Sequence, residues 1–153
     1  GSVGIQKINN LTQLNALEKE KEIIFQEYMS GQELGIDLYT DLITHKVVSI
    51  FAKKKLKMRA GETDKSVSYK NKALFDMIEK FAGEFKLIGA NDISEVNPRF
   101  GGGYIHAYEC GEKFPKYLIN NMNGISNQPN IGRYEEDVYM MKFFDIKMLK
   151  TEV

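Results

Sequence analysis

The segment from residue 33 to 41 alternates between apolar and polar side chains, and this alternation constrains the fold more than any other feature. The apolar set is Leu34, Ile36 and Leu38, and the polar set is Glu33, Asp37, Tyr39 and Asp41. Successive side chains of a strand point to opposite faces, so the period of two predicts a strand with an apolar face and a carboxylate-bearing face. A turn at 44–45 and an apolar run at 47–52 predict the second strand of an antiparallel hairpin.

Helical and strand-like segments follow one another along the rest of the chain. A helix is predicted at 11–17, with Asn10 as its N-cap, and a second at 74–81, with Gly83 closing it. A third is predicted at 105–122 and is interrupted or restarted at Gly111 and Pro115. Further strands are predicted at 23–28, 85–88 and 93–97, with one or two more in 134–149. Strands and helices joined by hairpins rather than regular crossovers predict an α+β fold, a mainly antiparallel sheet flanked by helices.

The predicted domain organisation has three parts. Residues 1–122 form the main domain. Residues 123–133 are rich in Gly, Asn, Ser and Pro, which is typical of a linker or mobile loop. Residues 134–153 are dense in aromatic and apolar side chains and are expected to be a C-terminal strand extension that packs on the domain.

Charge and composition exclude several classes of partner. The chain has 21 Lys and Arg against 21 Asp and Glu, so its formal net charge is zero, and binding of nucleic acid by overall charge is not expected. No apolar run approaches the ~20 residues of a membrane span, and no signal peptide is visible. One cysteine, Cys110, forms no internal disulfide, which favours a cytoplasmic setting.

The segment from Ser94 to Tyr104 concentrates groups suited to phosphate chemistry. Glu95 and Asn97 are two residues apart on a predicted strand, so they share a face and offer oxygen ligands to a cation such as Mg²⁺. Arg99 follows with a planar guanidinium, and glycines 101–103 let the backbone approach a ligand closely. The combination favours phosphoryl transfer over the alternative of surface strand residues followed by a plain loop.

The string EVNPRFGGG at 95–103 resembles the signature of the ATP-grasp superfamily. Three other segments resemble parts of the ATP-grasp domain and follow the same order along the chain as in the family. GSVGI at 1–5 resembles the mobile phosphate loop, and FQEYMSGQE at 25–33 resembles the hinge strand that holds adenine. RAGE at 59–62 resembles the stretch after the central hairpin. NPRFGGGY followed by AYECG at 107–111 is most similar to the carbamoyl-phosphate-synthase-like branch. The resemblance covers roughly residues 1–122 and implies the C-terminal, nucleotide- and metal-binding half of an ATP-grasp domain.

The resemblance implies a role for each matching residue. The adenine site would be lined by Glu27, Tyr28 and Met29, and the ribose would be bound by Glu33. Glu95 would bridge Mg²⁺ or Mn²⁺ ions, Asn97 would complete the coordination, and Arg99 would contact the transferring phosphate. The loop that closes over the phosphates of ATP would be Gly1, Ser2, Val3 and Gly4. Glu95 and Arg99 would be the catalytic residues. Two interpretations of the basic stretch remain open. Its lysines, Lys53, Lys54 and Lys55, could form an exposed strand edge that prevents aggregation, or one of them, or Arg59, could bind phosphate.

The expected activity is that of an ATP-dependent ligase. Such an enzyme uses MgATP to convert a carboxylate substrate into an acyl phosphate, which then reacts with an amine or similar nucleophile. The alternative is a non-catalytic nucleotide-binding or oligomerisation module, and assembly of identical chains is left open. Nucleic-acid binding through residues 53–59 is disfavoured by the zero net charge.

Two features depart from the ATP-grasp pattern. Nothing in the sequence corresponds to the N-terminal half of the family's domain. The family also places another metal ligand on a strand joined by a hairpin to the Glu-x-Asn strand, whereas here residues 89–93 run directly into Ser94 and Glu95. A hairpin is not expected to fit in this interval, and on one continuous strand Asp92 would face away from Glu95.

Overall fold

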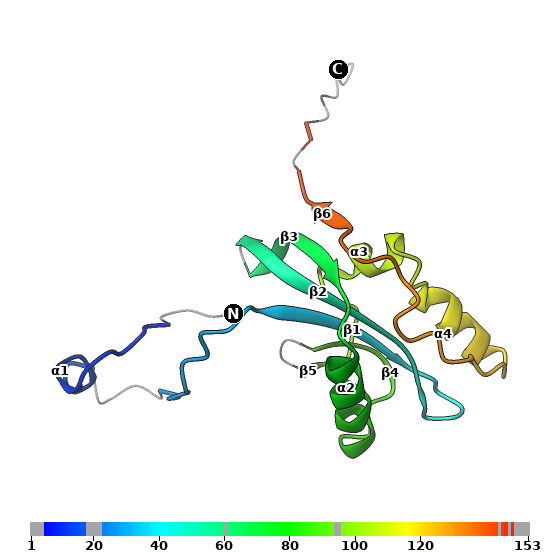
Figure 1. Cartoon of the computed structure of the whole chain (residues 1–153), viewed down its shortest axis with the longest axis horizontal. Coiled ribbons are helices and arrows are strands. Elements are labelled where there is room, and N and C mark those ends of the chain that lie inside the picture. The colour runs from blue at the N-terminus through cyan, green and yellow to red at the C-terminus, as the bar shows by residue number, and fades with distance from the viewer. Residues whose placement is uncertain are drawn as a thin grey trace, which may run out of the picture. The chain divides into compact units, whose positions relative to one another are not determined.

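The computed structural model describes residues 5–17, 23–59, 61–93, 96–143, 145–146 and 148. The chain divides into two compact units, Gly1–Gln32 and Glu33–Val153, and each is considered by itself (Figure 1). The described residues of the larger unit form a sheet and three helices, which confirms the predicted α+β class. Within the described residues, no helix is long and apolar enough to cross a membrane.

The sheet of the larger unit has six strands, and every recorded pairing is antiparallel. The strands are β1 (Leu34–Thr40), β2 (Val47–Arg59), β3 (Glu62–Tyr69), β4 (Gly89–Ile93), β5 (Val96–Asn97) and β6 (Tyr139–Met141). Their order across the sheet is β5-β4-β1-β2-β3-β6. The predicted hairpin is confirmed as β1 and β2, with His45 in the turn at a φ of 56°. These two strands form the centre of the sheet.

The two faces of β1 are both buried, although one of them is polar. Ile36 and Leu38 join the apolar cluster that includes Phe75 and Ile78 of α2. Asp37 and Tyr39 point to the opposite face, as the period of two requires. Figure 1 shows α2 on one side of the strands and α3 and α4 on the other. The carboxylate-bearing face is therefore an interior surface, covered by helices.

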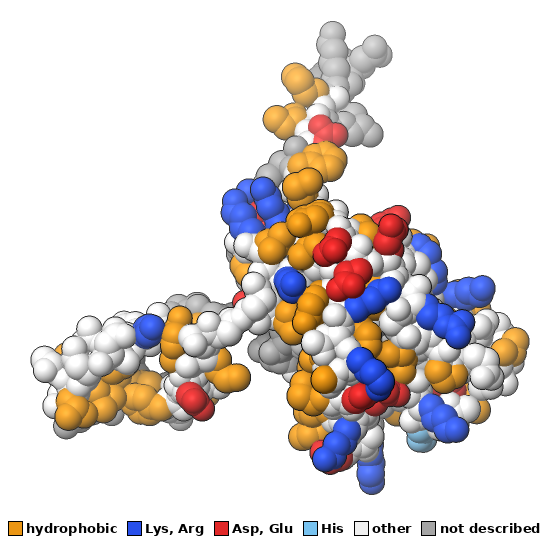
Figure 2. All heavy atoms as spheres, viewed as in Figure 1, with side chains coloured by type: hydrophobic (Ala, Val, Ile, Leu, Met, Phe, Trp, Pro, Cys, Tyr) orange, Lys and Arg blue, Asp and Glu red, His pale blue; other side chains and the backbone are white. Residues whose placement is uncertain are grey.

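The helix α2 (Lys72–Glu84) covers the apolar face of the sheet. The side chain of Asn71 accepts a hydrogen bond from the amide of Leu74 at 2.9 Å and so caps its start. On its outer side, Lys72 pairs with Asp76 at 2.8 Å, and Figure 2 shows basic and acidic side chains interspersed over this face. The helix extends past Gly83, so the prediction that Gly83 closes it is wrong by about one residue.

The helices α3 (Tyr104–Glu109) and α4 (Phe114–Met122) cover the polar face. The predicted interruption is confirmed: Gly111 has a φ of 103°, a conformation that L-residues rarely adopt, and Pro115 lies in the first turn of α4. Phe114 is buried against Tyr39, with ring centroids 5.6 Å apart, and against Tyr104 at 4.9 Å. Aromatic contacts therefore fix α4 to β1.

Two of the predicted strands do not form, and one strand was not predicted. Residues 23–28 form no strand, and Ile24 and Phe25 are 85% and 67% exposed, because an isolated extended segment lacks a hydrogen-bonding partner. Residues 85–88 form the turn after α2, in which the amide of Leu87 bonds the carbonyl of Ala82. The strand β3 was not predicted, because its buried positions include the polar Ser66 and Ser68 rather than an apolar set.

The buried carboxylate of Asp41 joins the β1–β2 turn, α4 and the following loop. Its Oδ1 accepts hydrogen bonds from the amides of Ile43 and Thr44, both at 2.9 Å, and its Oδ2 from the side chain of Asn121 at 2.8 Å and the amide of Asn127 at 2.7 Å. Burial alone would raise the pKa of Asp41, but these hydrogen bonds outweigh it and hold the pKa well below its usual range. The carboxylate therefore stabilises the folded state in its charged form.

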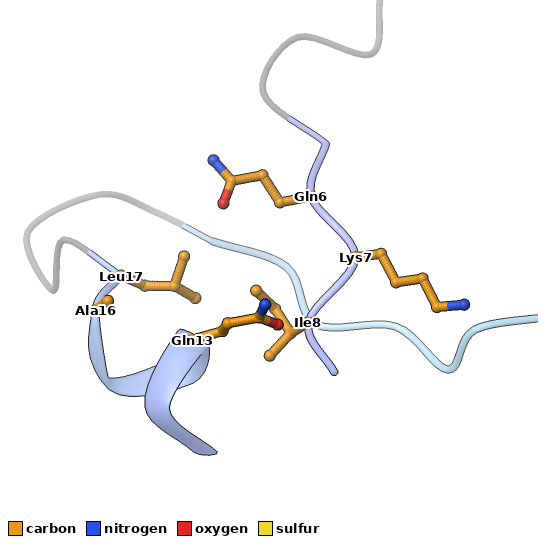
Figure 3. Close-up of a pocket in the computed structure, with 6 residues that line it drawn as sticks. All are labelled: Gln6, Lys7, Ile8, Gln13, Ala16 and Leu17. Carbon is orange, nitrogen blue, oxygen red and sulfur yellow. The ribbon is translucent and has the colours of Figure 1, made fainter. Parts of the chain in front are cut away.

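In the smaller unit, residues Leu11–Asn15 form the helix α1. Asn10 caps it as predicted, because its side chain accepts a hydrogen bond from the amide of Gln13 at 2.9 Å. A shallow pocket of about 250 Å³ lies beside this helix. Figure 3 shows its lining, which is Gln6, Lys7, Ile8, Gln13, Ala16 and Leu17. The lining is mostly uncharged, so this pocket carries no argument for catalysis.

Candidate functional site

Glycines 101–103 lie directly against charged side chains of the sheet. A Cβ atom added to Gly101 would lie 2.6 Å from Oδ2 of Asp92, closer than real Cβ atoms come to other atoms. The same atom on Gly102 would lie 3.2 Å from Cδ of Glu62, and on Gly103 it would lie 3.1 Å from Nζ of Lys53. A side chain at position 101 would therefore force Asp92 to move, and the backbone of this loop reaches three charged groups.

A tight hairpin joins β4 to β5, which corrects the prediction that none could fit. Ile93 pairs with Val96 and Asp92 with Asn97, so the two strands are connected by residues 94 and 95 alone. Two residues are the shortest common hairpin connection. The prediction of one continuous strand over 93–97 is wrong for the same reason, because the chain reverses within that segment. Ser94 and Glu95 themselves lie outside the described residues.

Three oxygen-bearing side chains occupy one row across the sheet. Asn97 pairs directly with Asp92 on β4, and Asp92 pairs directly with Asp37 on β1. Directly paired residues of an antiparallel sheet project to the same face, so all three point to the side covered by α3 and α4. Within the described part of the chain, no group of three or more His, Cys, Asp or Glu residues is arranged to hold a metal ion. Asp92 and Asn97 place two oxygen donors side by side on this face.

The buried ion pair of Lys53 and Asp37 contacts the glycine loop from the side of the sheet. Nζ of Lys53 lies 2.5 Å from Oδ2 of Asp37 and donates to the carbonyl of Gly103 at 3.0 Å, and both charged side chains are at most 3% exposed. Burial raises the pKa of Asp37, and the neighbouring Lys53 opposes that rise. The ammonium thus connects the sheet to the last glycine of the loop.

The basic stretch of β2 has several separate roles. Because β2 lies between β1 and β3, the interpretation of these lysines as an exposed sheet edge is wrong. Lys54 lies over the ring of Tyr69 at 4.3 Å, and Lys55 pairs with Glu33 at 2.7 Å. Nε of Arg59 lies 3.9 Å from the buried carboxylate of Asp64. Among the four candidates for phosphate binding, Lys53 contacts the glycine loop through the carbonyl of Gly103.

Lys142, just after β6, holds the outer side of the loop. Its Nζ donates to Oε2 of Glu62 at 2.8 Å and to the carbonyl of Gly102 at 3.2 Å. The hydrogen bond from Lys142, together with its charge and that of Arg99, lowers the pKa of Glu62. Sequence analysis missed Lys142 and Asp92 as members of the site. Lys142 lies 40 residues from Gly102, in an apolar tail, so no local pattern indicated the contact.

Arg99 stands at the exposed rim of the loop. Its backbone amide donates to the carbonyl of Asn97 at 2.8 Å, which turns the chain sharply after β5. Its guanidinium donates to the carbonyl of Phe100 at 3.0 Å, and Arg99 is solvent-exposed. Arg99 and Asn97 therefore belong to the same small region as the three glycines.

The other predicted site residues are placed elsewhere or lie outside the described residues. The predicted site residues outside the described part of the chain are Gly1, Ser2, Val3, Gly4 and Glu95. Glu27, Tyr28 and Met29 belong to the smaller unit, in a segment without a strand, where Tyr28 carries the ammonium of Lys7 3.7 Å above its ring. Glu33 belongs to the larger unit and pairs with Lys55.

Comparisons with known proteins add no relative from which function could be transferred. No protein-family model matches the chain, and no curated protein matches it. Any assignment of function must therefore be argued from the residues of the glycine loop and its surroundings.

Proposed function

We propose that this chain forms the nucleotide- and metal-binding part of an ATP-dependent ligase of the ATP-grasp type. The observation that carries the proposal is the position of the glycine loop. Its backbone lies against Asp92 and Lys53, beside Asn97 and Arg99. A loop without side chains that is surrounded by metal-type oxygen donors and cations suits a polyphosphate, because phosphate oxygens need amide donors and positive charge.

A divalent cation would be held by the oxygen donors at the end of the β4–β5 hairpin. Asp92 and Asn97 pair directly and share a face, which supports carboxylate and amide ligation of Mg²⁺ or Mn²⁺. Glu95, which comes between them in the sequence, would add a third protein ligand. A cation bound there supplies positive charge to the phosphate oxygens of ATP. This donor set contains no soft ligand, so zinc or copper is disfavoured.

The residues around the loop divide into those that would touch phosphate and those that position them. Arg99, exposed at the rim, offers a guanidinium to the transferring phosphoryl group. Lys53 is already engaged by Asp37 and by the carbonyl of Gly103, so it is a positioning residue. Lys142 fixes Gly102 from the other side. The amides of the loop would then face the nucleotide in a preorganised arrangement.

The proposed reaction has two steps. A carboxylate oxygen of the substrate attacks the γ-phosphorus of ATP, the bond to ADP breaks, and an acyl phosphate forms. An amine then attacks the acyl carbon, the bond to the phosphate oxygen breaks, and inorganic phosphate and a proton leave. Positioning and charge stabilisation would supply most of the rate enhancement.

Trapping with hydroxylamine tests this reaction without knowledge of the amine. The chain is incubated with MgATP, hydroxylamine and a panel of carboxylic acids, and acyl hydroxamate and ADP are measured. We expect equal amounts of hydroxamate and ADP with at least one acid, and a loss of about 100-fold or more in Arg99→Met. Arg133→Met, which removes a guanidinium elsewhere, is the matched control and should retain the rate.

A non-catalytic nucleotide-binding module is the second candidate. The same contacts around the glycine loop support it, because they suit nucleotide binding whether or not a chemical step follows. In that case the chain binds ATP, yet no acid in the panel yields hydroxamate or ADP. That result would overturn the ligase proposal and leave the binding site intact.

A further inference from the structure

The ends of β2, β3 and β6 continue the sheet face beyond the part that α2 covers. The apolar cluster under α2 takes in Ile36, Ile50 and Ala52 of this face. Beyond it, two rows of directly paired residues, the outer rows, cross the three strands. They are Lys54, Val67 and Tyr139 in the first row and Lys57, Lys65 and Met141 in the second. Ser66, between Lys65 and Val67, points the other way and contacts His106 of α3 at 2.8 Å, so the outer rows lie on the face opposite α3.

Positive charge predominates at this end of the sheet. Nζ of Lys57 and Nε of Arg59 lie 3.8 and 3.9 Å from the carboxylate of Asp64, whose side chain is 4% exposed. One carboxylate offsets one of these two cations, and Lys65 adds another exposed cation. Figure 2 shows basic side chains gathered over this end of β2 and β3. The chain as a whole is neutral, but its charges are unevenly distributed, and a local excess of cations attracts a polyanion.

An exposed aromatic ring lies in the rows that carry these cations. Tyr139 is 64% exposed and Met141 is 63% exposed, and both belong to β6, the strand at the edge of the sheet. Single-stranded nucleic acids bind to such a combination, because a base stacks on the ring and phosphates pair with the cations. A lipid surface would instead favour apolar side chains that project beyond the cations, whereas here both kinds occupy neighbouring positions of one sheet face.

We propose that the outer rows bind a single-stranded nucleic acid. Tyr139 stacks on a base, while the lysines of the second row and Arg59 contact phosphates. Stacking requires no particular base, so binding tolerates different sequences. The surface is separate from the glycine loop, because Lys53, which contacts that loop, and Lys54 are consecutive on β2 and project to opposite faces. The proposal therefore does not depend on the ligase reaction.

The test is fluorescence anisotropy of the full chain with a labelled oligouridylate RNA of about 12 nucleotides, a length within the usual range of single-strand binding sites. We expect saturable binding with a Kd below about 100 µM at about 50 mM salt. Three phosphate contacts predict a slope of about −2 for the logarithm of the association constant against that of the salt concentration, so affinity should fall about 15-fold between about 50 and 200 mM salt. Absence of saturable binding below that Kd, or binding that does not change with salt, would overturn the proposal.

Variants identify the residues that contact the RNA. Tyr139→Leu removes the ring and keeps an apolar side chain, so binding should weaken about tenfold. Phe85→Leu, at the end of α2, is the matched control, because Phe85 is also 64% exposed, and it should leave binding unchanged. Lys65→Ala should weaken binding and reduce the salt slope by about 0.7, whereas Lys116→Ala on α4 should change neither. Unchanged binding in Tyr139→Leu or in Lys65→Ala, each checked for folding by circular dichroism, would contradict the surface.

Two further ligands separate this partner from its alternatives. A double-stranded RNA of the same length keeps its bases inside the helical stack and should bind more weakly than the single strand. Vesicles of phosphatidylserine and phosphatidylcholine present an anionic lipid surface and should not bind the chain under the same conditions. Equal or tighter binding of the duplex, or vesicle binding that Tyr139→Leu and Lys65→Ala abolish, would overturn the proposal.

Discussion

Lys53→Ala is expected to destabilise the larger unit by about 3–5 kcal/mol, because it leaves the carboxylate of Asp37 buried without its partner. Both side chains are almost fully inaccessible, at 3% and 2% exposure, so water cannot replace the lost ammonium. The variant also removes the hydrogen bond to the carbonyl of Gly103. The free energy of unfolding is measured by urea denaturation followed by circular dichroism.

Two control variants make this prediction specific to the buried pair. The double variant Lys53→Met with Asp37→Leu replaces both charges by apolar groups of similar size, and we expect it to recover most of the lost stability. Lys54→Ala removes the neighbouring lysine, which lies over the Tyr69 ring, and should cost about 1 kcal/mol or less. A loss below about 1 kcal/mol in Lys53→Ala would show that the pair does not hold the sheet and loop together.

Asp41→Ala is expected to cost about 4 kcal/mol or more in the free energy of unfolding. The carboxylate is fully buried and accepts hydrogen bonds from two backbone amides of the turn, from Asn121, and from both the amide and the side chain of Asn127. Its removal leaves several buried donors without acceptors. Asp41→Asn keeps one acceptor oxygen and should lose less.

The contribution of Asp41 to the free energy of unfolding depends on pH, and its lowered pKa determines the direction of that dependence. The pKa of Asp41 is lower in the folded chain than its usual value of 3.8, so the charged carboxylate stabilises the fold above about pH 4. This contribution declines as the pH falls below that value. The stability difference between wild type and Asp41→Asn should therefore shrink on acidification from pH 6 to pH 3. A difference that stays constant or grows over this range would contradict the assignment.

The central hairpin could be predicted because its pattern is local. The period of two over residues 34–38 identified β1, and the polar turn at 44–45 identified its connection to β2. The burial of the polar face could not be predicted, since it depends on α3 and α4, more than 60 residues later in the chain. The sequence therefore placed Asp37 on the carboxylate-bearing face without a partner, and its actual partner Lys53 was one of four candidates for phosphate binding.

The failed predictions share a cause, which is that isolated segments do not reveal their partners. The polar strand β3 exists because it pairs with β2 on one side and β6 on the other, although its sequence has no apolar alternation. Residues 23–28 pair with no strand among the described residues and form no element of regular structure. Strand pairing at long range decided both outcomes.

The candidate site was predictable only where its residues are adjacent in sequence. Asn97, Arg99 and glycines 101–103 form one motif, and the structure places them in one region. Asp92 was misjudged because the two-residue connection to β5 was not expected. Glu62 and Lys142 join the loop from segments 40 residues away on either side, which no local motif indicates.

The most direct test of the central claim is calorimetric titration of the chain with ATP, with and without Mg²⁺. The account predicts saturable binding at a single site that requires the metal and is weakened at least about tenfold in Asn97→Leu, whose folded state is checked by circular dichroism. Absence of binding, or binding that is the same without Mg²⁺ and in Asn97→Leu, would contradict a nucleotide and metal site at the glycine loop.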